Sequence, residues 1–191
     1  MERMTAKQYR QSQQGRINRA QGAHFEEAIE AACVHYDLQG EAFIEKTPEP
    51  MKILKPINRQ RGTFEAVFSK SAQPDFKGTI RGGQGVCFDA KHTSCDRIEQ
   101  KAISQEQKEA LDKHEALGAW CFVLVSLGHR FYRVPWNTWK DMKQRFGHKY
   151  MDAEDLGPYE VEFKGGVIRF LDMAKGSREF LDRQFGTTTQ A

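Results

Sequence analysis

Two aspartates and a lysine have the residue types and the spacing that could support phosphodiester hydrolysis. Thirteen residues separate Asp75 from Asp89, which lies two positions before Lys91. Residues 75–92 are predicted to form two strands joined by a glycine-rich turn. Alternate side chains of a strand point to opposite faces, so Asp89 and Lys91 would share one face, with Asp75 brought beside them. Two carboxylates suit a hard cation such as Mg²⁺, and the lysine can polarise a water molecule or stabilise charge on a phosphate.

The same spacing also fits a surface hairpin that carries a simple ion pair, because Asp and Lys two positions apart are common. Other polar residues favour a functional site. Gln107 lies on the apolar stripe of a helix predicted over 98–117, where a buried amide needs a polar partner. Glu26 and Glu30 are one turn apart on the flank of an earlier helix, and either could complete a cation site.

The elements that must position these residues alternate between helices and strands. Apolar residues recur with helical spacing from Phe25 to Tyr36, and residues 119–127 form a continuous apolar run, typical of a strand covered on both faces. This order predicts one α/β domain in which helices flank a mixed sheet. Further strands are predicted at 41–46, 64–69 and 129–135, a short helix at 136–146, a strand pair around 164–166 and a helix at 174–185.

The chain ends and one proline-rich connection fall outside this pattern. Prolines at positions 48, 50 and 56 disfavour a compact regular element, so residues 51–68 are predicted to be a projecting, basic insertion. The predicted parts are a flexible basic arm at 1–15, the domain at 16–185 and a frayed tail at 186–191.

Positive charge is concentrated in two segments of the chain. The net charge is +3, but residues 1–22 and residues 46–61 each carry +4, which leaves −5 on the remainder. Two basic segments on a mildly acidic body favour a polyanionic partner such as nucleic acid. A solvated tail and a solvated loop would give the same pattern, so charge alone leaves both interpretations open.

Composition excludes several classes of protein. Hydrophobic residues make up 39% and charged residues 29% of the 191, which argues against a disordered or fibrous chain. The longest apolar run is seven residues, against the roughly 20 that a membrane helix needs. The N-terminus has no secretory signal, and the four cysteines lack zinc-binding spacing. We therefore expect a cytoplasmic protein with reduced thiols and no membrane partner.

Several motifs follow one another in a fixed order around the candidate site. The PD-(D/E)xK nucleases have a signature that matches Pro74-Asp75 followed by Asp89-Ala90-Lys91. Residues 88–93 resemble the Phe-Glu-Ala-Lys-Glu-Thr strand of one group of these nucleases. Over residues 16–135 the chain resembles the RecU-type Holliday junction resolvases, and its brevity favours a phage-type member. The other segments that carry this resemblance are 22–26, 44–50, 64–78, 104–107 and 118–122.

This resemblance implies a restriction-endonuclease-like nuclease fold and a homodimer that binds a four-way DNA junction. The dimer would nick two strands symmetrically with Mg²⁺ or Mn²⁺, in DNA recombination and repair, with a recombinase as a further partner. Residues 51–68 match the stalk that enters the junction centre. The implied catalytic residues are Lys91, Asp75, Asp89 and Glu26, and the implied metal-site residues are Asp75, Asp89 and Gln107. The implied DNA contacts are Arg16, Arg19, Lys46, Lys52, Lys55, Arg59 and Arg61.

The sequence departs from the family pattern at two positions near the site. Asp89 stands where the family usually has Glu, and Gln73 stands where it has Thr. Two other functions stay open: a nuclease of the same chemistry that acts on another DNA structure, and a non-catalytic DNA-binding recombination module. An unchanged junction preference after deletion of residues 51–62 would support the first alternative. Absence of Mn²⁺ binding at Asp75 and Asp89 in calorimetry would favour the second.

Overall fold

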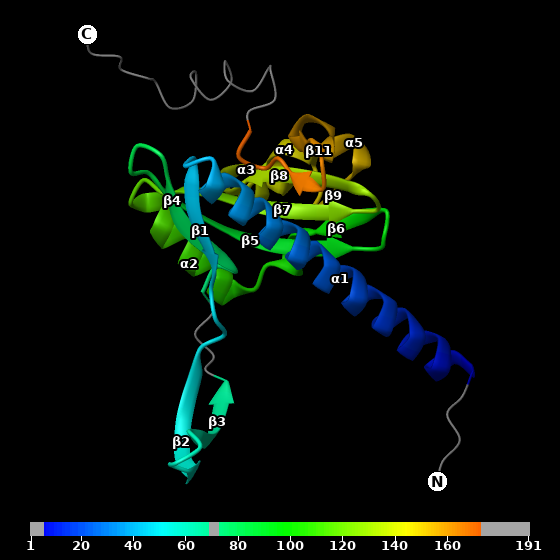
Figure 1. Ribbon diagram of the computed structural model, residues 1–191. Helices are drawn as coiled ribbons and strands as arrows, with labels where there is room; N and C mark the ends of the chain where they lie inside the picture. The colour runs from blue at the N-terminus through cyan, green and yellow to red at the C-terminus, as the bar shows by residue number, and fades with distance from the viewer. Residues whose placement is uncertain (1–5, 69–72, 173–191) are drawn as a thin grey trace.

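A six-stranded mixed sheet lies at the centre of the structure, a computed structural model that describes residues 6–68 and 73–172. Its strands, in order across the sheet, are β1 (Ala42–Lys46), β4 (Phe76–Ile80), β5 (Gly85–Thr93), β7 (Trp120–Leu127), β8 (Arg130–Pro135) and β10 (Glu160–Val161). β5 and β7 are parallel, and the other neighbours are antiparallel. Helix α1 (Ala6–Leu38) crosses one face, and α2 (Gln105–Ala116) lies on the other (Figure 1). The predicted α/β class is confirmed.

Both faces of the central strands are buried, because their side chains alternate between two cores. Phe88 of β5 and Phe122 of β7 pack under α1, where they share a core with Phe25. Val123, the next residue of β7, points to the opposite face and belongs to a second core with Leu111 of α2. The apolar run that predicted a strand covered on both faces is β7.

Helix α1 begins at Ala6, whereas the sequence predicted a flexible arm over residues 1–15. Ala, Lys, Gln and Arg, which favour helix, dominate residues 6–15, and no proline interrupts them. Residues 6–15 are therefore helical, and their predicted flexibility stays a prediction. Residues 1–5, the predicted helix at 174–185 and the predicted tail at 186–191 lie outside the described residues.

The helix predicted over 98–117 is shorter than expected. Its first part belongs to strand β6 (Arg97–Glu99), which pairs antiparallel with β9 (Tyr150–Asp152). Helix α2 begins only after Ser104, whose hydroxyl accepts a hydrogen bond from the backbone N–H of Gln107. Pairing with a strand some fifty residues away overrides the local helical pattern, so the prediction is wrong before Ser104.

Residues 51–68, which we call the stalk, form a two-stranded antiparallel ribbon that projects away from the sheet (Figure 1). The ribbon consists of β2 (Met51–Asn58) and β3 (Thr63–Phe68), so the prediction that prolines prevent a regular element here is wrong. Pro56 faces Phe64, and the strand register shifts on both sides of it. A proline can occupy such a strand because the bulges and the open edge remove the need for its missing N–H.

The two faces of the stalk differ in chemistry. Met51 and Ile53 share one face with Phe64, and these side chains are 60%, 58% and 47% exposed. Lys52 and Lys55 lie on the opposite face, because they pair with Val67 and Glu65 of β3 and the register shift after Ile53 places Lys55 on that face. Within the described residues, no stalk side chain belongs to either core of the body. The stalk is therefore an appendage that the body does not need for its packing.

Short elements after β8 close the rest of the molecule. The helix predicted at 136–146 is divided into α3 (Trp136–Lys140) and α4 (Met142–Phe146), and the predicted strand pair around 164–166 is confirmed as β11 (Phe163–Lys164) and β12 (Val167–Ile168). The remaining elements are η1 (Gln100–Ala102), α5 (Ala153–Leu156) and η2 (Gly157–Tyr159). Within the described ranges, no helix has both the length and the apolar character that a membrane span requires.

Candidate active site

The register of the sheet brings Asp75, Asp89 and Lys91 into one group. Phe76 pairs with Phe88, which places Asp75 directly opposite Asp89 on neighbouring strands. The Lys91 Nζ lies 3.6 Å from Asp75 Oδ2 and 3.7 Å from Asp89 Oδ1. The three side chains therefore converge on the face of the sheet that α2 covers, as the spacing predicted.

Gln107 joins this group from the first turn of α2. Its Nε2 donates a hydrogen bond to Asp89 Oδ1 at 2.5 Å, and its Oε1 accepts one from the backbone N–H of Ser104 at 3.1 Å. The amide is thus held at both ends, by the helix cap and by the carboxylate. This supplies the polar partner that an inward glutamine requires. The geometry suits a residue that orients Asp89. The Oε1 atom, through which Gln107 would bind a metal, already accepts the hydrogen bond from Ser104.

Asp89 is fully buried, so ionising its carboxyl group costs free energy. Burial first, and then the neighbouring Asp75 carboxylate, raise the pKa of Asp89 to about 7, although the Lys91 ammonium acts in the opposite direction. Asp89 Oδ2 is buried and has no hydrogen-bond partner among the described residues. Such an atom in a polar site marks a place where a ligand can bind.

The donor set fits a hard divalent cation. Asp75 Oδ2 accepts a hydrogen bond from the backbone N–H of Ala90 at 2.9 Å, which fixes this carboxylate beside Asp89. Within residues 6–68 and 73–172, no third His, Cys, Asp or Glu side chain completes a metal-binding cluster with them. A cation such as Mg²⁺ commonly binds through one or two carboxylates and takes its other ligands from water and phosphate.

Comparison with known proteins assigns the chain to a family. A family model of Recombination protein U, RecU, matches residues 20–176. This chain belongs to the RecU family. Two proteins named Holliday junction resolvase RecU, from Streptococcus pneumoniae strains G54 and R6, are each 30% identical over 164 residues, which is 81% of this chain and 82% of theirs. A solved structure of Hjc, a Holliday junction resolvase from Archaeoglobus fulgidus, aligns with a TM-score of 0.45 and 15% identity over 72% of this chain and 93% of Hjc.

Glu26, which the RecU resemblance implies as a catalytic acid, binds a lysine that the sequence argument did not connect with it. The Lys46 Nζ lies 2.8 Å from Glu26 Oε2 and 2.9 Å from Glu30 Oε1. The hydrogen bonds to Glu26 and then Glu30 raise the pKa of Lys46 above its usual value. Two glutamates one turn apart could have suggested a lysine partner, but nothing local to the sequence points to residue 46.

The implied DNA contacts of this RecU-family chain are distributed between the stalk and α1. Lys52, Lys55, Arg59 and Arg61 are exposed on the stalk, where the Lys55 Nζ lies 3.0 Å from Glu65 Oε2. Lys46 is at the foot of the stalk, and its charge is offset by two carboxylates. Arg16 and Arg19 lie on α1, but their side chains are outside the described part of the structure.

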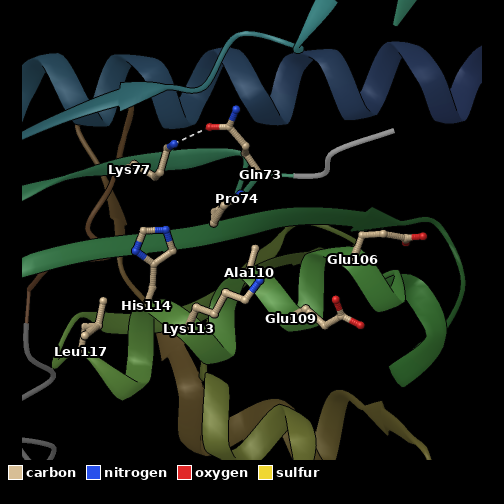
Figure 2. Close-up of a pocket in the computed structure, with 9 residues that line it drawn as sticks. All are labelled: Gln73, Pro74, Lys77, Glu106, Glu109, Ala110, Lys113, His114 and Leu117. Carbon is tan, nitrogen blue, oxygen red and sulfur yellow. Dashed lines mark hydrogen bonds between the residues drawn. The ribbon is translucent and has the colours of Figure 1, made fainter. Parts of the chain in front are cut away.

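A pocket of about 360 Å³ opens next to Asp75, between the start of β4 and α2 (Figure 2). Gln73, where the RecU resemblance has Thr, lines this pocket and accepts a hydrogen bond from the Lys77 Nζ at 2.6 Å. Figure 2 shows the Gln73 amide directed toward Lys77. The other lining residues are Pro74, Glu106, Glu109, Ala110, Lys113, His114 and Leu117.

Proposed function

We propose that this protein is a structure-specific endonuclease of the cytoplasm that resolves four-way DNA junctions by metal-dependent hydrolysis in recombination and repair. The observation that carries the proposal is the convergence of Asp75, Asp89 and Lys91, whose charged atoms lie within 3.7 Å of the lysine. Membership of the RecU family supports the junction as the substrate, because the relatives compared above are named Holliday junction resolvases.

Asp75 and Asp89 would hold a divalent cation, which would be Mg²⁺ or a substituting Mn²⁺. When bound, the cation supplies a Lewis acid for the phosphodiester and lowers the pKa of water. The Lys91 ammonium lies between both carboxylates, where it can orient a water molecule and stabilise negative charge on the phosphate. Gln107 holds Asp89 in one orientation through its 2.5 Å hydrogen bond.

The stalk is well placed to read the shape of the DNA. It is inserted between β1 and β4, and the Thr47 N–H donates to the Asp75 carbonyl at 2.8 Å across its base. A DNA strand at Asp75 therefore lies at the foot of the stalk. The exposed basic side chains along the stalk are positioned to contact phosphates of the junction arms.

The decisive experiment compares cleavage of a labelled four-way junction and of a duplex with the same sequence, with and without Mg²⁺. Lys91→Ala should reduce junction cleavage by at least about 100-fold, as expected when a stabilising charge is removed from an active site. Lys77→Ala is the matched control, since Lys77 lies on the neighbouring strand and bonds only to Gln73 among the contacts described. It should cleave like the parent protein.

The outcomes separate the three candidate functions. Paired symmetric nicks in the junction alone, dependent on metal and on Lys91, support the resolvase. Equal cleavage of junction and duplex would keep the nuclease site and reject junction specificity. Tight junction binding without cleavage of either DNA would leave a non-catalytic binding module.

A second experiment tests the stalk. Replacing residues 51–68 with a short Gly-Ser linker should preserve the fold, because the stalk contributes no described side chain to either core. Duplex binding and Mn²⁺ binding should persist, whereas the preference for the junction should be lost. An unchanged junction preference would contradict the role proposed for the stalk.

A further inference from the structure

Thr47 stands in line with the two aspartates of the candidate site. In the β1–β4 register Lys46 pairs with Phe76, and the next backbone contact joins the Thr47 N–H to the Asp75 carbonyl at 2.8 Å. Thr47 is therefore directly opposite Asp75, as Asp75 is directly opposite Asp89. Directly opposed residues of an antiparallel pair project from the same face. Thr47, Asp75 and Asp89 thus form a row across three neighbouring strands.

The ends of this row carry two buried polar atoms that have no hydrogen-bond partner among residues 6–68 and 73–172. Thr47 Oγ1 and Asp89 Oδ2 both have this property, and Asp75 lies between them. The two other such side-chain atoms in the described part of the chain belong to Tyr132 and Trp139, on β8 and α3. A valine would fill the space of Thr47 without burying an unpaired hydroxyl. Among the described residues the hydroxyl therefore costs stability, and a polar ligand bound beside it would supply the missing partner.

We propose that Thr47 is a positioning residue of the nuclease site. Its hydroxyl hydrogen-bonds a water molecule that enters with the divalent cation and holds this water on the Asp75 side of the row. Mg²⁺ and Mn²⁺ retain several waters in protein sites, and hydrogen bonds to the outer shell of a metal contribute to its affinity. The inference rests on the proposed function, because it requires the cation site at Asp75 and Asp89.

The test measures Mn²⁺ affinity by calorimetry on the full chain without DNA, together with thermal unfolding of the metal-free protein. Thr47→Val should weaken Mn²⁺ binding roughly 3- to 10-fold. The same substitution should raise the unfolding temperature of the metal-free protein by about 2–4 °C, because the unpaired hydroxyl is gone. Thr47→Ser, which keeps the hydroxyl, should bind Mn²⁺ like the parent protein. Thr79→Val, at an exposed position of β4, is the matched control and should change neither quantity.

The outcomes distinguish this inference from the proposed function. Parental Mn²⁺ affinity in Thr47→Val, with binding abolished in Asp75→Asn, would overturn the role of Thr47 and leave the cation site intact. Equal loss of affinity in Thr47→Val and Thr47→Ser would also overturn it, because the hydroxyl would not be the group that matters. No Mn²⁺ binding by the parent protein would overturn both proposals. If Thr47→Val does not fold, Thr47→Ala provides the same comparison.

Discussion

Asp89 is the residue at which stability and function oppose each other. Its side chain is fully buried, yet it lies beside a second carboxylate and must be ionised to bind a cation. The Lys91 ammonium and the Gln107 amide compensate part of this cost, and Asp89 Oδ2 receives no compensation from the described residues. A loss of stability of this kind is typical of sites that bind a ligand.

Asp89→Asn should stabilise the metal-free protein at high pH. The pKa of Asp89 is raised from the ordinary value of 3.8 to about 7, so the folded protein holds the proton more tightly than the unfolded chain. The stability that this proton contributes is fully present below pH 4 and is lost as the pH rises through 7. At pH 8 the variant should gain about 1–3 kcal/mol in free energy of unfolding. At pH 4 the gain should nearly vanish.

Urea denaturation in the presence of a chelator measures this difference at both pH values. Asp152→Asn, whose side chain caps α5, is a comparison variant that should change stability little at either pH, because asparagine caps a helix about as well as aspartate. Equal stability of Asp89→Asn and the parent protein at pH 8 would contradict the assigned cost of ionising Asp89.

Gln107→Ala tests whether the orientation of Asp89 matters for cleavage. The variant removes the donor to Asp89 Oδ1, and junction cleavage should fall about 10- to 100-fold, as for other outer-shell partners of metal ligands. Gln105→Ala is the matched control on the same helix, since its amide contacts the exposed Glu109 carboxylate. Full activity of Gln107→Ala in the cleavage assay would show that Asp89 needs no such partner.

In the proposed function, the stalk is the element that separates DNA recognition from chemistry. Its strands emerge where β1 and β4 lie side by side, next to Asp75, and its exposed apolar face has no partner within the described chain. A two-stranded ribbon buries little of its own apolar surface. We therefore expect the stalk to act through contacts with another molecule.

Neutralising the basic residues of the stalk that form no ion pair within the described part of the chain should change the salt dependence of junction binding. Replacing Lys52, Arg59 and Arg61 with alanine removes up to three phosphate contacts, so the slope of log K against log salt should decrease by about 2–3. Lys55→Ala should have a smaller effect, because Glu65 already pairs with Lys55 at 3.0 Å. Binding titrations at several salt concentrations measure the slope, and an unchanged slope would place the phosphate contacts elsewhere.

At the scale of the whole molecule, each chain carries one group of Asp75, Asp89 and Lys91. Symmetric nicking of two strands requires two such groups facing one junction. Sedimentation equilibrium should therefore give twice the chain mass of 22.0 kDa. When the parent protein and Asp75→Asn are coexpressed and mixed dimers isolated, those dimers should nick one strand only. A monomer that produces paired nicks would contradict this arrangement.

The parts of the fold that sequence alone determined depend on neighbours in the chain. Alternation in β5 places Asp89 and Lys91 on one face, and the glycine-rich turn before β5 brings back Asp75, so their convergence was predictable. The buried strand β7 was also predictable, because a short continuous apolar run bounded by glycines is typical of a strand covered on both faces.

Only the tertiary structure decided which distant residues become neighbours. Pairing with β9 converts residues 97–99 from predicted helix to strand, and the ribbon partner of β2 accommodates Pro56. Lys46 meets Glu26 across the sheet edge, and Thr47 lies opposite Asp75 because two strands far apart in the chain share one register. Local periodicity carries no information about such pairings, since they are selected by the packing of the whole chain.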